Sequence, residues 1–389
     1  MLKLNRLLYS SVNEAFFDTI APTERQYATL ETAKNLIRDY LRPAIRESTV
    51  SVLGLSQAVT PRFRTQGSWK YRTCVQPAWM PPQQIDWDFG VYLPVSVWED
   101  NGPPRKMAQL YFKLVEGLLE KLCRQHGWRL VPGKDTCIRV QVTAWGHIDV
   151  PLYAVPEKEF EQIMERALRA NQLRKAANDS FARMDAAVEL EEQEWAELDS
   201  IVLATRSGEW KSSDPEAVCK WYLDRIEEHN EQLRRVCTYL KAWRDYHWKD
   251  GDGPTSVAIM VAVAQAFECF IGRDDLALEH AARTLARSLK GDIREDGIDQ
   301  GAEDFNRRLN EQARHDASSK AQALVEALMP ARSLTVGYEV SAITLLRAHL
   351  GDRLPASRDL VDADSGADSV RSVPARTVPA PLVRSTKAG

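Results

Sequence analysis

Three aspartates in strand-like apolar segments constrain this chain more than any other feature. Asp86 and Asp88 belong to the run Ile-Asp-Trp-Asp-Phe-Gly, and Asp149 belongs to the run His-Ile-Asp-Val. In a strand, residues i and i+2 point to the same side, so we expect Asp86 and Asp88 to project together. Buried carboxylates are costly unless they are paired or bind a metal. For Asp149, the alternative is an ion pair with a nearby arginine such as Arg139.

Carboxylates in this arrangement suit magnesium. Mg²⁺ prefers near-octahedral oxygen coordination, with one or two carboxylates plus phosphate oxygens. A third carboxylate from a neighbouring strand completes a pair of metals about 4 Å apart, which can clamp the attacking and leaving oxygens of an in-line displacement. The three aspartates therefore predict a two-metal site that acts on a nucleoside triphosphate.

Further candidates for phosphate binding are scattered along the chain. The Gly67-Ser68 turn has the backbone freedom and the hydroxyl of an anion-binding turn, although most such pairs are plain turns. Lys241 lies on a helix with an apolar face, and it either meets a triphosphate or snorkels to water. Ser256 lies at a predicted helix N-terminus, where it either caps the helix or helps to bind a phosphate. Ser213 precedes Asp-Pro, a common helix start.

Composition excludes several classes. The chain has 389 residues, 44% hydrophobic and 27% charged, and a formal net charge of −4. These values favour a soluble protein of two lobes, and the acidic balance argues against a protein that mainly grips long nucleic acid. The beginning of the chain is too interrupted by charge for a signal peptide, and no apolar run approaches the roughly 20 residues of a membrane span. We therefore expect a cytoplasmic protein without membrane contact and with reduced cysteines.

Periodicity divides the chain into a mixed α/β lobe and an all-helical lobe, with a cleft between them. Helices are predicted to residue 50, with Thr23 as a cap and an end before Pro43, and then over 107–126 and 157–198. Strands are predicted at 84–95, 128–131 and 137–150. The expected divisions are 1–205 for the first lobe with its N-terminal helices, 206–352 for the helical lobe, and 353–389 for a disordered tail rich in Ser, Ala, Asp, Arg and Pro.

The motifs in this order resemble the bacterial cGAS/DncV-like nucleotidyltransferases, the signal-making enzymes of cyclic-oligonucleotide anti-phage systems. The resemblance runs over most of the chain, from the N-terminal helices to Gly-Asp-Arg-Leu-Pro at 351–355. It rests on Gly67-Ser68, Asp86-x-Asp88, Asp149, Trp210-x-x-Ser213-Asp214-Pro215, the run Tyr-Leu-Lys-Ala-Trp at 239–243, and Ser256. Gln66-Gly67-Ser68 and the run Ile-Asp-Val-Pro-Leu-Tyr at 148–153 are most similar to the DncV-type dinucleotide cyclases.

This resemblance implies a polymerase-β-like nucleotidyltransferase core with a C-terminal helical lobe and a central active-site cleft. It implies two Mg²⁺ ions, with Mn²⁺ as a substitute, on Asp86 and Asp88, and Asp149 on the ion that activates the attacking hydroxyl. The donor triphosphate would lie on Ser68, Lys241 and Ser256. Further nucleotide contacts would come from Gln66, Gly67, Tyr71, Arg139, Ser213 and Asp304.

The implied substrates are ATP and GTP, and the implied product is 3′3′-cyclic GMP-AMP, which would activate a downstream effector. Cyclic di-AMP, a pyrimidine-containing ring, a trinucleotide and linear or RNA-primed products stay open as alternatives. A scaffold without chemistry would be expected to lack a metal carboxylate, and antitoxin-like nucleotidyltransferases are usually much shorter. The resemblance also implies a ubiquitin-like conjugation enzyme acting on Gly389, with an ordinary frayed terminus as the alternative.

Overall fold

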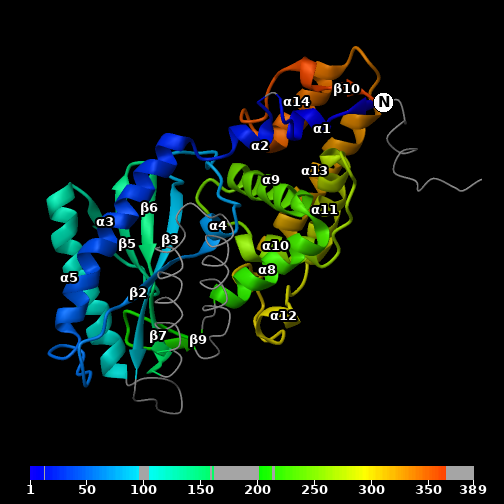
Figure 1. Cartoon of the computed structure of the whole chain (residues 1–389). Helices are drawn as coiled ribbons and strands as arrows, with labels where there is room; N and C mark the ends of the chain where they lie inside the picture. Colours follow the sequence, from blue (N-terminus) through cyan, green and yellow to red (C-terminus); the bar gives the residue numbers. More distant parts are fainter. Residues whose placement is uncertain (13, 96–104, 158–159, 162–200, 213–214, 365–389) are drawn as a thin grey trace, which may run out of the picture.

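Two lobes make up the molecule in the computed structural model, which describes residues 1–12, 14–95, 105–157, 160–161, 201–212 and 215–364 (Figure 1). One lobe is a mixed sheet with helices against it. The other is built almost entirely of helices. The predicted fold class, α/β followed by an all-helical lobe, is confirmed.

The sheet of the first lobe has the strand order β4-β5-β6-β3-β7-β8-β9, and β2 pairs with β3. Its strands are β2 (Arg62–Thr65), β3 (Ile85–Val95), β4 (Arg129–Val131), β5 (Ile138–Thr143), β6 (Gly146–Val150), β7 (Leu152–Pro156), β8 (Val202–Ala204) and β9 (Trp210–Ser212). The long strand β3 runs parallel to β6 along its first half and parallel to β7 along its second half. This pairing makes β3 and β6 the frame of the candidate site.

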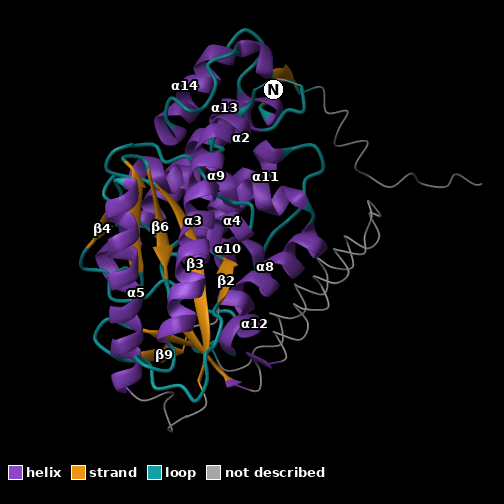
Figure 2. Cartoon of the chain, turned by 60° about the vertical axis from the view of Figure 1, so that its left-hand side comes forward, coloured by secondary structure: helices purple, strands orange, loops and turns teal. Residues whose placement is uncertain are grey.

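Two long helices, α3 (Glu24–Ser48) and α5 (Arg105–His126), cover one face of the sheet (Figures 1 and 2). Trp87 of β3 is buried in the same apolar cluster as Ile37 of α3 and Phe112 of α5. Because side chains alternate along a strand, the residues on either side of Trp87 face away from these helices. Short helix α4 (Gly67–Lys70) lies on that other side, towards the helical lobe.

Helix α3 begins as expected and ends later than expected. Thr23 and Gln26 form the predicted capping box, with Gln26 N donating to Thr23 Oγ1 at 3.2 Å. The helix does not end before Pro43 but continues to Ser48, because Ile45 packs in the core beneath it. Pro43 occupies an exposed position, where water can satisfy the carbonyl that loses its helical partner.

The helical lobe contains α8 (Pro215–His229), α9 (Glu231–His247), α10 (Ser256–Ala264), α11 (Asp274–Ser288), α12 (Asp296–Asp299), α13 (Glu311–Ser333) and α14 (Glu339–Leu350). Helix α10 is the apolar centre of this lobe, and its residues from Ala258 to Ala264 are all buried. This apolar run is therefore the middle of the helical bundle and not a surface helix.

Both ends of the described chain belong to the helical lobe, which differs from the expected divisions. The N-terminal elements β1 (Leu2–Lys3), α1 (Asn5–Leu8) and α2 (Phe16–Thr19) pack into the helical core rather than the first lobe. Beyond residue 352 the chain forms η1 (Arg358–Leu360) and β10 (Asp362–Ala363), and β10 pairs with β1. The predicted tail therefore starts too early. Residues 365–389 lie outside the described residues.

Two further expectations about strands are corrected. The segment 137–150 is a hairpin of β5 and β6 rather than one strand, since the chain turns between Thr143 and Gly146. The hairpin β8–β9 was not predicted, because strands of three residues carry too little periodicity to detect. Most of the helix predicted over 157–198 lies outside the described residues.

Candidate active site

Strand pairing brings the three aspartates together at the junction of β3 and β6. The parallel register places Asp86 beside His147 and Asp88 beside Asp149. All four residues share one side of the sheet, because each strand contributes positions i and i+2. The polar cluster lies on the side opposite the helices that cover Trp87. The predicted convergence of the carboxylates is therefore found.

The Gly67-Ser68 turn is held directly against these carboxylates. Gln66 N donates to Asp88 O at 3.0 Å, and Trp69 Nε1 donates to Asp86 O at 2.8 Å. Gly67 has a φ of +62°, and a Cβ placed on it would lie 2.2 Å from Asp88 Oδ2. Only glycine permits this close approach.

Electrostatics separate the carboxylates of the cluster. Burial, together with the charges of Asp86 and Asp149, raises the pKa of Asp88 well above its usual range. For Asp149 burial acts in the same direction, but the Arg139 guanidinium outweighs it and lowers the pKa. Arg139 Nε and Nη2 each donate to an Asp149 oxygen at 2.6 Å. The ion pair with Arg139, which was the alternative for Asp149, is therefore present, and metal binding by Asp149 stays a prediction.

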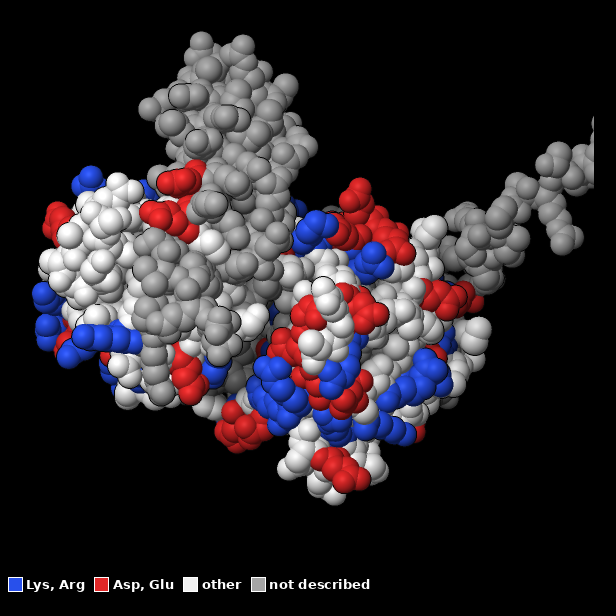
Figure 3. Space-filling view, turned by 90° about the horizontal axis from the view of Figure 1, so that it is seen from below, with Lys and Arg blue, Asp and Glu red and all other residues white. Residues whose placement is uncertain are grey.

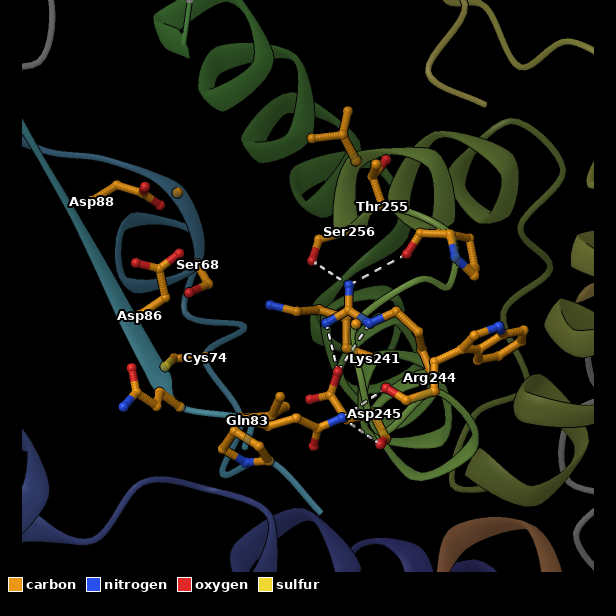
Figure 4. A pocket seen from close by; sticks show the side chains of 18 of the residues that line it. Ser68, Cys74, Gln83, Asp86, Asp88, Lys241, Arg244, Asp245, Thr255 and Ser256 are labelled. Carbon is orange, nitrogen blue, oxygen red and sulfur yellow. Dashed lines mark hydrogen bonds and ion pairs between the residues drawn. The ribbon is translucent and has the colours of Figure 1, made fainter. Parts of the chain in front are cut away.

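The helical lobe contributes cations from across the cleft (Figure 4). Lys241 of α9 is buried, and its Nζ donates to the backbone oxygen of Thr73 and, at 3.2 Å, to Thr73 Oγ1. Burial lowers the pKa of Lys241 to about 8. Lys241 therefore does not snorkel to bulk water but lies at the wall of the cleft.

Ser256 begins helix α10 but does not cap it. Thr255 is the cap, and its Oγ1 accepts from Ala258 N at 3.1 Å. The Ser256 hydroxyl instead accepts from Arg244 Nη1 at 2.9 Å. Arg244 also donates to Asp245 Oδ1, at 2.9 Å from Nε and 2.7 Å from Nη2. The start of α10 thus presents a hydroxyl and a guanidinium to the cleft.

Two cavities meet at the aspartates. The larger, of about 620 Å³, is lined by Asp86, Arg139, Lys241, Arg244 and Ser256, among others. The smaller, of about 300 Å³, is lined by Gln66, Asp149 and Tyr153, among others. Gly67, Tyr71, Asp88 and Val257 line both cavities. Two ligands could therefore approach the same carboxylates from different sides.

The donor set fits a divalent metal. One ligand atom from each of Asp86, His147 and Asp149 lies within 4.8 Å of the others. The carboxylate of Asp88 faces the same space from the next position on β3. Hard oxygen donors concentrated in this way are what Mg²⁺ and Mn²⁺ require.

Most predicted site residues line these cavities, but some do not. Asp304 does not line either cavity: Oδ1 accepts from Ile293 N and Asn306 N, and Oδ2 accepts from Arg314. In the structure the carboxylate holds the 292–306 loop, and its contact with nucleotides stays a prediction. Ser213 lies outside the described residues.

Gln66 lies in the smaller cavity, but its amide is already engaged. Gln66 Nε2 donates to Tyr92 OH, and Gln66 Oε1 accepts from Tyr153 OH at 3.3 Å. Ser68 and Tyr71 line the larger cavity as predicted, and Ser68 O accepts from Thr73 N at 2.9 Å.

Sequence reasoning missed His147 and Arg244 as members of the site. His147 shares the strand face of Asp149, so the alternation of β6 carried a signal for it. Arg244 follows Lys241 by one helical turn, and that spacing was the available signal for it.

Comparison with known proteins places this geometry in a family. Residues 61–153 match the family model "Cyclic GMP-AMP synthase DncV-like, nucleotidyltransferase domain", and residues 230–363 match "Cyclic GMP-AMP synthase, C-terminal domain". The two matches together span more than half of the chain. The chain belongs to the DncV-like nucleotidyltransferases.

Curated relatives of this DncV-like chain are cyclic GMP-AMP synthases. One from Vibrio cholerae serotype O1 is 35% identical over 243 residues, which cover 60% of this chain and 53% of the relative. One from Escherichia coli strain TW11681 is 32% identical over 288 residues, which cover 72% of this chain and 63% of the relative. The matched part of the chain thus spans between half and two thirds of these relatives.

Solved DncV structures share the fold. The V. cholerae DncV cyclic AMP-GMP synthase in complex with the linear intermediate 5′ pppA(3′,5′)pG has a TM-score of 0.73 at 24% identity, covering 93% of this chain and 98% of that one. The 3′-deoxy GTP bound form of E. coli DncV has a TM-score of 0.70 at 22% identity, covering 93% and 100%. Among the described residues of this DncV-like chain, no helix has the length and apolarity to cross a membrane.

Proposed function

We propose that this chain is a metal-dependent cyclic dinucleotide synthase that makes 3′3′-cyclic GMP-AMP from ATP and GTP. The observation that carries the proposal is the position of Asp86, Asp88 and Asp149 where two cavities meet. A synthase of this kind has to hold two nucleotides on opposite sides of one set of carboxylates. The names of the curated relatives supply the product.

The larger cavity suits the donor triphosphate. Lys241 brings positive charge from one lobe, Arg244 brings N–H donors from a guanidinium paired with Asp245, and the Ser68 turn faces them from the other lobe. Hydrogen-bond donors and fixed charges that are in place before the reaction stabilise the charge that builds up on transferring phosphates. Ser256 is held by Arg244 at 2.9 Å, so its hydroxyl is positioned before a ligand arrives.

Divalent ions would be held by Asp86, Asp88 and Asp149. When bound, such ions neutralise phosphate charge and favour the deprotonated form of the attacking hydroxyl. Asp149 lines the smaller cavity, which we assign to the acceptor nucleotide. Arg139 orients the Asp149 carboxylate through its two hydrogen bonds.

Each transfer exchanges one bond for another. The 3′-oxygen of the acceptor forms a bond to the α-phosphorus of the donor, the bond to pyrophosphate breaks with its electron pair going to the pyrophosphate, and the hydroxyl proton passes to solvent water. Positioning and charge neutralisation supply most of the catalysis in such displacements. The linear intermediate then turns over in the cleft, and a second transfer closes the ring.

The test is incubation of the purified full chain with all four nucleoside triphosphates and Mg²⁺, followed by phosphatase treatment and mass spectrometry. A phosphatase-resistant species with the mass of cyclic GMP-AMP is expected. A different cyclic species would show that the product is not cyclic GMP-AMP. Linear oligomers alone would contradict the proposed cyclisation. Asp86→Asn with Asp88→Asn should abolish pyrophosphate release while preserving the circular dichroism spectrum.

A second candidate, an RNA-primed nucleotidyltransferase, expects a long basic surface. On the face seen in Figure 3, acidic and basic side chains are interspersed over the helical lobe. In the helical lobe, the ion pairs Arg294–Asp292 and Arg307–Glu303 are examples of such neighbouring opposite charges. This mixture favours the synthase over the RNA-primed enzyme.

Conjugation of Gly389 to a target by a ubiquitin-like enzyme, and activation of an effector by the product, belong to the same proposal. The β1–β10 pair and the Arg273–Asp364 ion pair, with N–O at 2.9 Å, fix the chain just before residue 365. Deletion of Gly389 should remove higher-mass conjugates in cells that carry the conjugation enzyme. Conjugates that persist would refute this part of the proposal.

A further inference from the structure

His147 occupies a place in the polar cluster that the three aspartates do not explain. It lies on β6, whose five residues are all buried, and its own side chain is 5% exposed. The register places it directly beside Asp86, on the strand face that carries Asp149 two positions later. The imidazole therefore points into the carboxylates rather than into the apolar core.

The hydrogen bonds of Gln84 determine which nitrogen of His147 carries a proton. Gln84 Nε2 donates to Ala144 O at 3.0 Å, which orients the amide. Gln84 Oε1 then lies 2.8 Å from His147 Nδ1. Because an amide oxygen can only accept, Nδ1 donates to it, and Nε2 is the nitrogen left to face the carboxylates. Histidines that bind metals commonly donate their other nitrogen to an oxygen in this way.

Nε2 of His147 faces Asp86 Oδ1 at ion-pair distance, without the geometry of a hydrogen bond. His147 Nε2 lies 3.0 Å from Asp86 Oδ1 and 3.9 Å from Asp149 Oδ1. Within the part of the chain that the structure describes, neither Nε2 nor Asp86 Oδ1 has a hydrogen-bond partner. Buried polar atoms without a partner are costly and rare. A cation between Nε2 and Oδ1 would satisfy both atoms at once.

We propose that His147 Nε2, Asp86 and Asp149 form a mixed nitrogen and oxygen site that favours Mn²⁺ over Mg²⁺. This deepens the proposed function, on whose metal dependence it rests. Imidazole nitrogen suits transition metals, whereas Mg²⁺ binds oxygen almost exclusively. Asp149 stays available although Arg139 donates to both of its oxygens, since each carboxylate oxygen has a second lone pair.

The test measures metal binding without nucleotide or turnover. Mn²⁺ is titrated into the full chain and followed by electron paramagnetic resonance, and electron spin-echo modulation detects nitrogen bound to the ion. We expect an imidazole signal that changes when the histidines are labelled with ¹⁵N. The variant His147→Asn keeps a donor near Gln84 but removes Nε2. It should weaken Mn²⁺ binding by about 10- to 100-fold and Mg²⁺ binding by less than about 3-fold.

His126→Ala is the matched control, because His126 is an exposed histidine at the end of α5. It should leave both the signal and the affinity unchanged. The double variant Asp86→Asn with Asp88→Asn tests the metal site separately from the role of His147. Loss of Mn²⁺ binding in this variant supports a metal site at the aspartates. Mn²⁺ bound in an Asp86-dependent way without a nitrogen signal would overturn the role of His147 and leave the synthase intact. If His147→Asn does not fold, the ¹⁵N experiment on the unmodified chain still shows whether a histidine nitrogen binds Mn²⁺.

Discussion

The most specific prediction at the scale of single residues concerns the variant Gly67→Ala. Gly67→Ala places a Cβ 2.2 Å from Asp88 Oδ2, so the turn or the carboxylate must shift. Displacement of a catalytic group by about 1 Å can cost on the order of 100-fold in rate. We expect a loss of kcat of at least that order with a modest loss of stability. Steady-state pyrophosphate release and urea unfolding measure the two effects.

Gly54 offers a control for this variant. It has a φ of +71°, close to that of Gly67, but nothing lies within 4 Å of a Cβ placed on it. Gly54→Ala therefore carries a similar backbone strain, on the order of 1–3 kcal/mol, without a contact at the site. Equal losses of activity in the two variants would show that strain, and not the approach to Asp88, limits Gly67.

Lys241 predicts opposite effects of pH on activity and on stability. Burial lowers its pKa to about 8, so the free protein loses this charge as the pH rises through that value. We expect kcat/KM for ATP to fall above pH 8, because kcat/KM reports groups of the free enzyme. Lys241→Arg keeps its charge and should not show this fall. A wild-type profile that is identical to that of Lys241→Arg would contradict the role of the charge.

The lowered pKa of Lys241 also determines how the free energy of unfolding changes with pH. The pKa of Lys241 is lower in the folded chain than its ordinary value of 10.5. Between about pH 8 and 10.5 the unfolded chain therefore binds a proton that the native chain does not, and the free energy of unfolding rises with pH. Urea titrations of the wild type and Lys241→Met across this window should diverge in that direction.

The local sequence pattern was enough to select site residues whose position is set by a single strand, turn or helix. The shared face of the two aspartates of β3 follows from alternation, whereas the phosphate contacts of the Gly67-Ser68 turn and of Lys241 were implied by the resemblance and stay predictions. Asp304 and Gln66 were harder, because their polar atoms are engaged by Arg314 and by two tyrosines from other elements. Sequence does not reveal such partners, so it could not separate a ligand contact from a structural one.

At the scale of elements, a buried ion pair joins the lobes. Arg64 of β2 donates from Nε and Nη2 to the two carboxylate oxygens of Glu216 in α8, each at 2.7 Å. Arg64→Met leaves a charged carboxylate buried, which typically costs about 3–5 kcal/mol. We expect a lower midpoint of urea unfolding by that amount, and Arg64→Met with Glu216→Met should recover most of it.

An exposed pair provides the comparison. Arg124 and Glu120 are paired at 3.2 Å on α5 with side chains 65% and 60% exposed. Arg124→Met should change the free energy of unfolding by no more than about 0.5 kcal/mol. If Arg64→Met and Arg124→Met destabilise the chain equally, the buried pair does not hold α8 against the sheet.

The sequence predicted the ends of helices and strands where apolar residues recur with a regular period, and it missed them where this period is absent. The alternation of 85–95 gave β3 to within a residue, and helix α5 begins two residues earlier than its pattern suggested. The turn between β5 and β6 consists of Ala144 and Trp145, and the β-branched residues on both sides concealed it. Pro43 misled because a proline at an exposed helix position costs less than the packing of Ile45 gains.

At the scale of the whole molecule, the helical lobe is not one continuous segment of the sequence. Residues 1–12, 14–20 and 353–364 pack with the helices of the helical lobe, which is therefore closed by both ends of the described chain. Leu4 N donates to the buried Asp275 at 3.1 Å, and Asp274 N donates to Asn5 Oδ1 at 2.7 Å. Periodicity cannot predict such contacts, because they join residues about 270 positions apart.

Two truncations test where the folded unit ends. Leu354 and Leu360 are buried, and full burial of such a side chain contributes roughly 1.5–3 kcal/mol. Removal of 353–389 also deletes β10 and Asp364, one of the two ion-pair partners of Arg273, so it should lower the thermal midpoint by several degrees and expose the edge of β1. Removal of 365–389 deletes none of the described contacts and should leave the midpoint and synthase activity unchanged. Equal midpoints for the two truncated chains would mean that the folded unit ends before residue 353, as composition alone had suggested.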